Sequence, residues 1–119
     1  MLQLENEYGG WLLSPKSANS FAYIDYLYNL TISSNFTQLL FTSDNIIYSK
    51  LNPVRRISNL METANFGQDE PNLDQELWNM TKAQPDKPIY VSEYWTGWFD
   101  AWGQANHSTT SAKVSARFW

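Results

Sequence analysis

Two patterns of apolar and polar positions alternate along the chain. Short apolar runs that end in polar turn formers occur at the start of the chain and at residues 39–44, 61–66 and 89–91, and each predicts a buried strand. Between them, residues 18–30 and 73–82 carry apolar side chains at helical spacing. Strands that alternate with helices predict an α/β fold with a parallel sheet and crossover helices.

The predicted helix at residues 18–30 has its apolar side chains on one stripe, which we expect to pack against the sheet. The two prolines within residues 85–88 end the second helix. Residues 109–119 are predicted to begin a further helix.

Composition excludes several classes of function. The net charge is −4 and the eight basic residues are scattered. Proteins that bind nucleic acid have clustered Lys and Arg instead, so we expect no nucleic-acid partner. Adjacent Arg55 and Arg56 are interpreted as a solvated pair. No run of 18 apolar residues predicts a membrane span. The chain has no cysteine and His107 is its single histidine, so we expect no disulfide and no metal site.

Two carboxylate motifs stand out, at residues 3–9 and 92–100. Each contains a glutamate just after an apolar run, Glu7 in the first and Glu93 in the second. A glycosidase needs two such acids. The spacing between Glu7 and Glu93 corresponds to about three strand-plus-helix units of a (β/α)8 barrel, each of about 31 residues. It therefore predicts both acids at the carboxyl ends of parallel strands in a partial barrel.

The length sets the domain organisation. The 119 residues amount to less than half of a barrel of roughly 250 residues. We therefore interpret residues 1–119 as a fragment of a single catalytic barrel domain. No charged n-region followed by an apolar h-region is visible at the start.

Four sites fit the Asn-X-Ser/Thr acceptor pattern of N-glycosylation, and they predict a protein of the secretory pathway, lysosomal or extracellular. They are Asn29, Asn35, Asn79 and Asn106.

The motifs resemble those of the glycoside hydrolase family 35 β-galactosidases. The resemblance rests on residues 3–9, 41–44, 65–67 and 88–103. It implies about strands four to seven of a (β/α)8 barrel with their helices, and a retaining β-galactosidase that forms a covalent galactosyl-enzyme. It also implies Glu7 as the acid/base, Glu93 as the nucleophile and Asn6 as a ligand of the sugar hydroxyl next to the reacting carbon. The expected partner is a β-galactoside, and the chemistry needs no metal or organic cofactor.

Further site residues are predicted from their positions near the two acids. Glu5 is two positions before Glu7, so in a regular strand both side chains share a face, and Glu5 is predicted either to bind or orient the substrate or to act as a structural hydrogen-bond partner. Trp95 and Trp98 are predicted to line the galactose subsite. Asp44 is predicted to cap the helical segment after its strand. The remaining tryptophans are interpreted as core or loop anchors, and Asp100 as an orienting partner.

Two alternatives stay open. One is a retaining glycosidase with another sugar specificity, although many of these follow the first Asn-Glu with Pro where this chain has Tyr8 and Gly9. The other is an inactive or truncated homologue that binds carbohydrate or has a structural role. Loss of either glutamate would favour it, and both are present.

Overall fold

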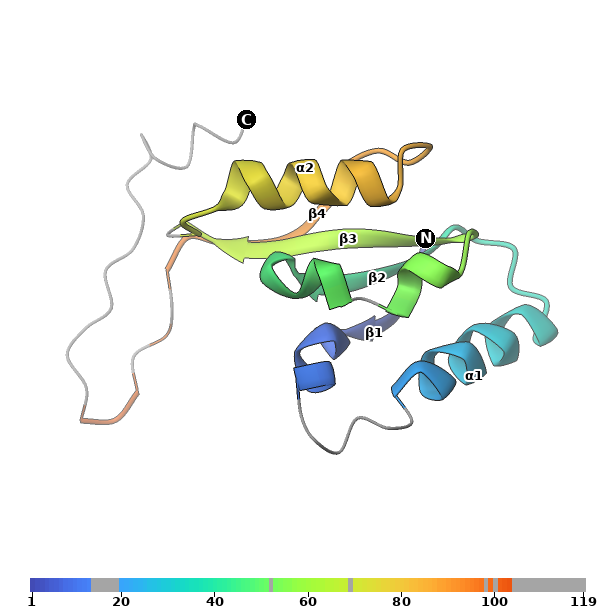
Figure 1. Ribbon diagram of the computed structural model, residues 1–119. Coiled ribbons are helices and arrows are strands. Elements are labelled where there is room, and N and C mark those ends of the chain that lie inside the picture. Colours follow the sequence, from blue (N-terminus) through green and yellow to red (C-terminus); the bar gives the residue numbers. More distant parts are fainter. Residues whose placement is uncertain (14–19, 52, 69, 98, 100, 104–119) are drawn as a thin grey trace.

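The computed structural model describes residues 1–13, 20–51, 53–68, 70–97, 99 and 101–103 (Figure 1). The predicted helix at residues 109–119 and the predictions for Trp98, Asp100 and Asn106 lie outside this part. Within it, no helix has both the length and the hydropathy of a membrane-spanning segment. In chain order the elements are β1 (Leu2–Asn6), η1 (Tyr8–Leu13), α1 (Ser20–Ser33), β2 (Leu40–Asn45), η3 (Ile46–Leu51), η4 (Pro53–Arg56), β3 (Leu60–Gly67), α2 (Leu73–Ala83) and β4 (Val91–Trp95).

The four strands form one sheet in the order β1-β2-β3-β4, and every neighbouring pair is parallel. Helix α1 links β1 to β2, the short 3-10 segments η3 and η4 link β2 to β3, and α2 links β3 to β4 (Figure 1). The α/β prediction is confirmed. The last strand begins later than predicted, at Val91, so Glu93 lies within β4 instead of following it.

The helices pack against one face of the sheet. Leu60, Ala64 and Phe66 are buried and occupy alternate positions that point to this face of β3. Leu60 contacts a cluster that contains Ile24 of α1, while Ala64 and Phe66 cluster with Met80 of α2. Burial of the large apolar side chains among them, such as Leu60, Phe66 and Met80, stabilises the fold by roughly 1.5–3 kcal/mol each. The predicted packing of the first helix on the sheet is confirmed at Ile24, which is 1% exposed.

The opposite face is polar near the carboxyl ends of the strands. Ser43 on β2 lies 2.8 Å from Ser92 on β4, measured between their hydroxyl oxygens, although β3 lies between the two strands. Two strand spacings on a flat sheet amount to about 10 Å, which two serine side chains do not span. The sheet is therefore curled around this face into a half-barrel, consistent with the predicted partial barrel.

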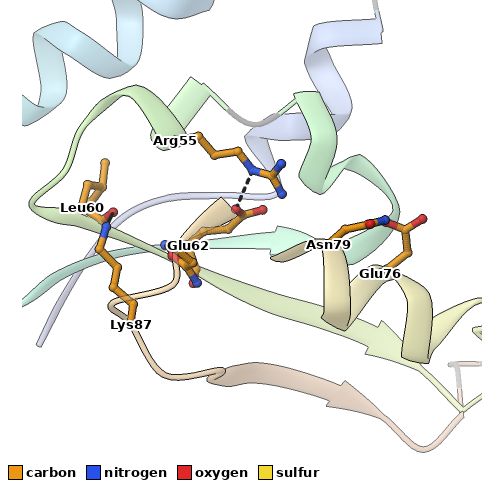
Figure 2. Close-up of polar contacts among 7 residues, drawn as sticks. Arg55, Leu60, Glu62, Glu76, Asn79 and Lys87 are labelled. Atoms are coloured by element: carbon orange, nitrogen blue, oxygen red, sulfur yellow. Dashed lines mark hydrogen bonds and ion pairs between the residues drawn. The ribbon is translucent and has the colours of Figure 1, made fainter. Parts of the chain in front are cut away.

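At the amino end of β3, side chains make the hydrogen bonds to the backbone that a neighbouring strand would otherwise make (Figure 2). The Glu62 N–H donates to Gln84 Oε1 at 3.0 Å, and Gln84 Nε2 donates to the Glu62 carbonyl at 2.8 Å. Lys87 Nζ donates to the Leu60 carbonyl at 2.8 Å. Burial lowers the pKa of Lys87, while the charges of Asp86 and Glu62 oppose that shift. Backbone groups of β3 that precede its pairing with β4 are thus satisfied.

The two adjacent arginines have different environments. Arg55 Nε lies 3.0 Å from Glu62 Oε2 (Figure 2), and the two side chains are 23% and 3% exposed. Arg56 makes a 3.3 Å ion pair with Asp25, and those side chains are 53% and 46% exposed. The interpretation of a solvated pair is therefore wrong for Arg55, because the buried Glu62 carboxylate needs an opposite charge.

Candidate active site

Glu7 and Glu93 lie on the two outer strands of the sheet, Glu7 just after the end of β1 and Glu93 within β4, as its third residue. Because the strands are parallel, their carboxyl ends are at the same edge of the sheet. Both side chains are half-buried. The backbone of Glu7 is held in the left-handed region, at φ 55°, which few residues other than glycine adopt.

A β-bulge precedes Glu7. Gln3 pairs with Phe41 and Asn6 pairs with Ser43, so β1 has one residue more than β2 in this stretch. Glu5 lies in the irregular segment with φ 101°. Such a backbone conformation costs of order 1–3 kcal/mol and persists only where the surroundings enforce it. Bulges commonly redirect side chains beside active sites.

The bulge separates Glu5 from Glu7. Tyr23 on α1 donates from its hydroxyl to Glu5 Oε1 at 2.6 Å, and the Asn6 N–H donates to Glu5 Oε2 at 2.9 Å. Glu7 Oε1 instead accepts a 3.1 Å hydrogen bond from Asn65 Nδ2. The shared face expected of a regular strand is therefore not found. Both Glu5 oxygens have partners within the chain, as in the structural alternative, and contact of Glu5 with a substrate stays a prediction.

A second bulge precedes Glu93. Ala64 pairs with Val91 and Asn65 with Glu93, so here β4 has the extra residue, Ser92. Consecutive side chains of a regular strand point to opposite faces. Across this bulge, both Ser92 Oγ and Glu93 Oε1 lie near Ser43 Oγ, at 2.8 and 3.4 Å. The irregularity therefore aims Glu93 at the polar face.

Side chains of the two middle strands connect the two acids. Asn65 Nδ2 donates to Glu7 Oε1 at 3.1 Å, and Asn65 Oδ1 accepts from Ser43 Oγ at 3.1 Å. Ser43 Oγ also lies 3.4 Å from Glu93 Oε1. Asn65 is 0% exposed and Ser43 is 1% exposed. Hydrogen bonds in such a water-poor setting are electrostatically stronger than in water. We call the path through Glu7, Asn65, Ser43 and Glu93 the acid bridge.

Sequence reasoning assigned no role to Asn65 or Ser43, although both lie in the motifs at residues 41–44 and 65–67. A usable signal was their position. Each is a polar residue near the carboxyl end of a buried strand, where barrel enzymes gather their functional groups.

The helix cap predicted at Asp44 is formed by Asn45. Asn45 Oδ1 accepts from the Ile47 N–H at 3.2 Å at the start of η3. Asp44 Oδ1 instead accepts from the Gly9 N–H at 3.0 Å. A Cβ at Gly9 would lie 3.3 Å from Tyr48 Cβ, so a side chain there would crowd this contact. Asp44 thereby ties η1, which follows Glu7, to β2.

The other predicted site residues have these positions. Asn6 ends β1, and its Oδ1 accepts from Gln3 Nε2 at 3.0 Å. Trp95 is half-buried, and its Nε1 donates to Glu93 Oε2 at 3.0 Å. Trp78 and Trp102 are 56% and 105% exposed, so the interpretation as core or loop anchors is wrong for these two. Trp78 lies on the outer side of α2, with Lys82 Nζ 4.4 Å from its ring centroid.

Three predicted glycosylation sites lie in the described part of the chain. Asn29 is exposed on α1 and Asn35 is exposed in the turn after it. Asn79 on α2 is half-buried, and its Nδ2 donates to Glu76 Oε2 at 3.1 Å (Figure 2). Asn29 and Asn35 have the better access for a glycan.

Known proteins of one family match nearly the whole chain, including both glutamate motifs. The model of glycosyl hydrolases family 35 matches residues 1–118. The chain is 32% identical over 116 residues to beta-galactosidase-1-like protein 3 of Rattus norvegicus, covering 98% of this chain and 16% of that protein. It is 32% identical over 116 residues to the beta-galactosidase of Xanthomonas manihotis, covering 97% and 17%. With the beta-galactosidase of Bos taurus, identity is 33% over 121 residues, covering 97% and 16%. The chain thus spans 16% to 17% of the length of these relatives.

Proposed function

The chain belongs to glycosyl hydrolases family 35, and on this premise we propose that it is part of the catalytic (β/α)8 barrel of a longer protein, here called the parent. In this proposal residues 1–119 contribute about strands four to seven of a single barrel domain. The parent is a retaining β-galactosidase that removes terminal β-galactosyl residues. The relatives named beta-galactosidase support this activity and substrate.

The acid bridge is the observation that supports the catalytic assignment most directly. Two glutamates from strands at opposite edges of the sheet are linked through only two side chains, Asn65 and Ser43. The bulge in β4 and the left-handed backbone of Glu7 accompany the orientation of these acids toward the same polar face. A pair of converging carboxyl groups is the arrangement that glycoside hydrolysis requires.

In the proposed mechanism the Glu93 carboxylate attacks the anomeric carbon while Glu7 donates its proton to the departing oxygen. A galactosyl ester of Glu93 forms. Water then enters, Glu7 takes a proton from it, and the attack of water on the anomeric carbon releases galactose and restores the Glu93 carboxylate. Retention requires the two carboxyl groups to stand about 5–5.5 Å apart in the complete barrel, whereas inversion needs about 6.5–9.5 Å.

We assign substrate contacts to the residues around the acids. Asn6 is proposed to bind the hydroxyl next to the reacting carbon. Trp95 lies beside Glu93 and is proposed to form one wall of the galactose subsite, together with Trp98. Glu5 is proposed to orient Asn6 through its 2.9 Å hydrogen bond with the Asn6 backbone.

We also propose that the parent enters the secretory pathway and acts in the lysosome or outside the cell. The exposed sequons at Asn29 and Asn35 support this location. Mass spectrometry of peptides from the native parent should find glycans at these asparagines.

The stereochemistry of the product tests the function. Proton NMR of a β-galactoside hydrolysed by the parent should detect β-galactose first, followed by slow mutarotation. First appearance of α-galactose would mean inversion and would exclude the mechanism. Turnover of β-mannosides or β-glucosides in preference to β-galactosides would keep the mechanism and change the substrate.

A further inference from the structure

The Ser43 hydroxyl has one proton and three oxygens within reach. Ser92 Oγ lies 2.8 Å from Ser43 Oγ, and either hydroxyl can donate in that pair. Asn65 Oδ1 lies 3.1 Å from Ser43 Oγ, and Glu93 Oε1 lies 3.4 Å from it. A hydroxyl donates only one hydrogen bond at a time. When its oxygen accepts from Ser92, Ser43 therefore bonds fully to either the amide of Asn65 or the carboxylate of Glu93.

Neighbouring hydroxyls direct this proton toward the acids. Thr63 Oγ1 lies 2.7 Å from both the Thr42 carbonyl and Ser92 Oγ, and its one proton can go to either. When Thr63 donates to Ser92, the Ser92 proton is available for Ser43 Oγ at 2.8 Å or for the Ala64 carbonyl at 3.3 Å, and the contact with Ser43 is the shorter. With Ser43 oxygen accepting from Ser92, its own proton points to Asn65 or Glu93.

From this geometry we propose that Ser43 is a positioning residue whose hydroxyl turns from Glu93 to Asn65 when Glu93 becomes the galactosyl ester, which readies Glu7 for the second step. This inference rests on the proposed function. Before the reaction, the ionised Glu93 is the stronger acceptor, because hydrogen bonds to charged groups are roughly twice as strong as neutral ones. In the ester that charge is absent, and the amide oxygen of Asn65 becomes the better acceptor.

The turn of Ser43 reaches Glu7 through the Asn65 amide. A hydrogen bond accepted at Oδ1 polarises the amide and strengthens donation by Nδ2. Nδ2 donates to Glu7 Oε1, and a stronger bond holds that oxygen more firmly in place. The Glu7 carboxylate is therefore positioned at the stage when it must accept a proton from water. No bond other than hydrogen bonds changes in this step.

The test separates the two chemical steps in the parent. With 2,4-dinitrophenyl β-galactoside, rapid mixing measures release of the aryl group, which reports formation of the ester, and the later steady rate reports its hydrolysis. Ser43→Ala should slow hydrolysis by about tenfold while ester formation changes by less than about threefold. Ser43→Thr keeps a hydroxyl and should restore hydrolysis. Ser92→Ala removes the hydroxyl that directs the Ser43 proton but leaves Ser43 and both of its acceptors in place, and should slow hydrolysis less than Ser43→Ala does.

A double-mutant cycle provides the second measurement. If Ser43 acts through the amide, adding Ser43→Ala to Asn65→Ala should cause no further loss in ester hydrolysis. Equal slowing of both steps by Ser43→Ala, or additive losses in the double variant, would overturn the inference while leaving the proposed function in place. Failure of the unmodified parent to hydrolyse β-galactosides would instead reject the proposed function, and the inference with it.

Discussion

Asn65 on β3 donates a 3.1 Å hydrogen bond to Glu7, which follows β1, two strands away in the sheet. Asn65 has no solvent exposure, so this contact belongs to the interior of the half-barrel. The acid at one edge of the sheet is thus oriented by a strand from its middle. Removal of this donor leaves Glu7 without that partner but retains the carboxyl group itself.

Asn65→Ala should therefore lower kcat of the parent on a β-galactoside by about tenfold or more, because small displacements of a reacting group can cost up to about a hundredfold. The expected change in KM is smaller, since Asn65 is not proposed to contact the sugar. Asn59→Ala is the matched control, because Asn59 is exposed just before the same strand. An unchanged kcat in Asn65→Ala would exclude an orienting role.

The two acids should differ in their dependence on the leaving group. Glu93→Gln should abolish turnover of aryl and alkyl β-galactosides alike, because the nucleophile is lost. Glu7→Gln should spare ester formation from an activated aryl galactoside, whose leaving group needs little protonation. Rates measured on both substrate types decide between these roles, and equal losses in both variants would refute them.

The adjacent arginines provide a stability test. Arg55→Met should lower the stability of the parent by about 2 kcal/mol or more, because the buried Glu62 carboxylate loses the opposite charge of Arg55. Arg56→Met should cost less than about 1 kcal/mol, since its pair with Asp25 is exposed. Thermal unfolding of both variants tests the difference. Similar midpoints would show that Glu62 does not depend on Arg55.

A pH dependence is expected at the contact between α1 and β1. The hydrogen bond to Glu5, with burial and the negative charge of Glu5 adding to it, raises the pKa of Tyr23 to about 12. The ordinary value of about 10 applies to the unfolded chain. The bond therefore stabilises the fold fully below about pH 10 and is lost as the pH rises through about 12. Thermal unfolding between these limits should depend less on pH in Tyr23→Phe than in Tyr26→Phe, whose tyrosine is exposed on the same helix. Identical pH dependence in the two variants would rule out this contribution.

Residues 1–119 expressed alone should not hydrolyse galactosides. A closed barrel pairs all of its strand edges and fills its interior from alternate strands, whereas β1 and β4 are the outer strands of this sheet. Water also has access to a half-open site, which weakens the electrostatic interactions there. Amide exchange and activity on an aryl galactoside would test this, and a protected, monomeric, active product would contradict the fragment interpretation.

The positions of the strands and helices could be predicted because apolar runs and helical spacing report directly on burial. The face of the sheet to which each acidic side chain points could not be predicted. A bulge leaves no mark in the hydrophobic pattern, so alternation placed Glu5 and Glu7 on one face, and the backbone at Glu5 separates them. The ion pair of Arg55 was missed for a related reason: Glu62 is a charged residue inside an apolar strand, and only the fold reveals which cation lies beside it.

The bulge in β4 also makes the site sensitive to the register of this strand. If β4 continued regularly from the pair of Val91 with Ala64, Ser92 would lie opposite Asn65, and Glu93 opposite Phe66, which packs toward the helices. The sheet would gain a more regular ladder, and Glu93 would turn away from the polar face. A slip of one residue in β4 would thus leave a protein that folds and has no chemistry.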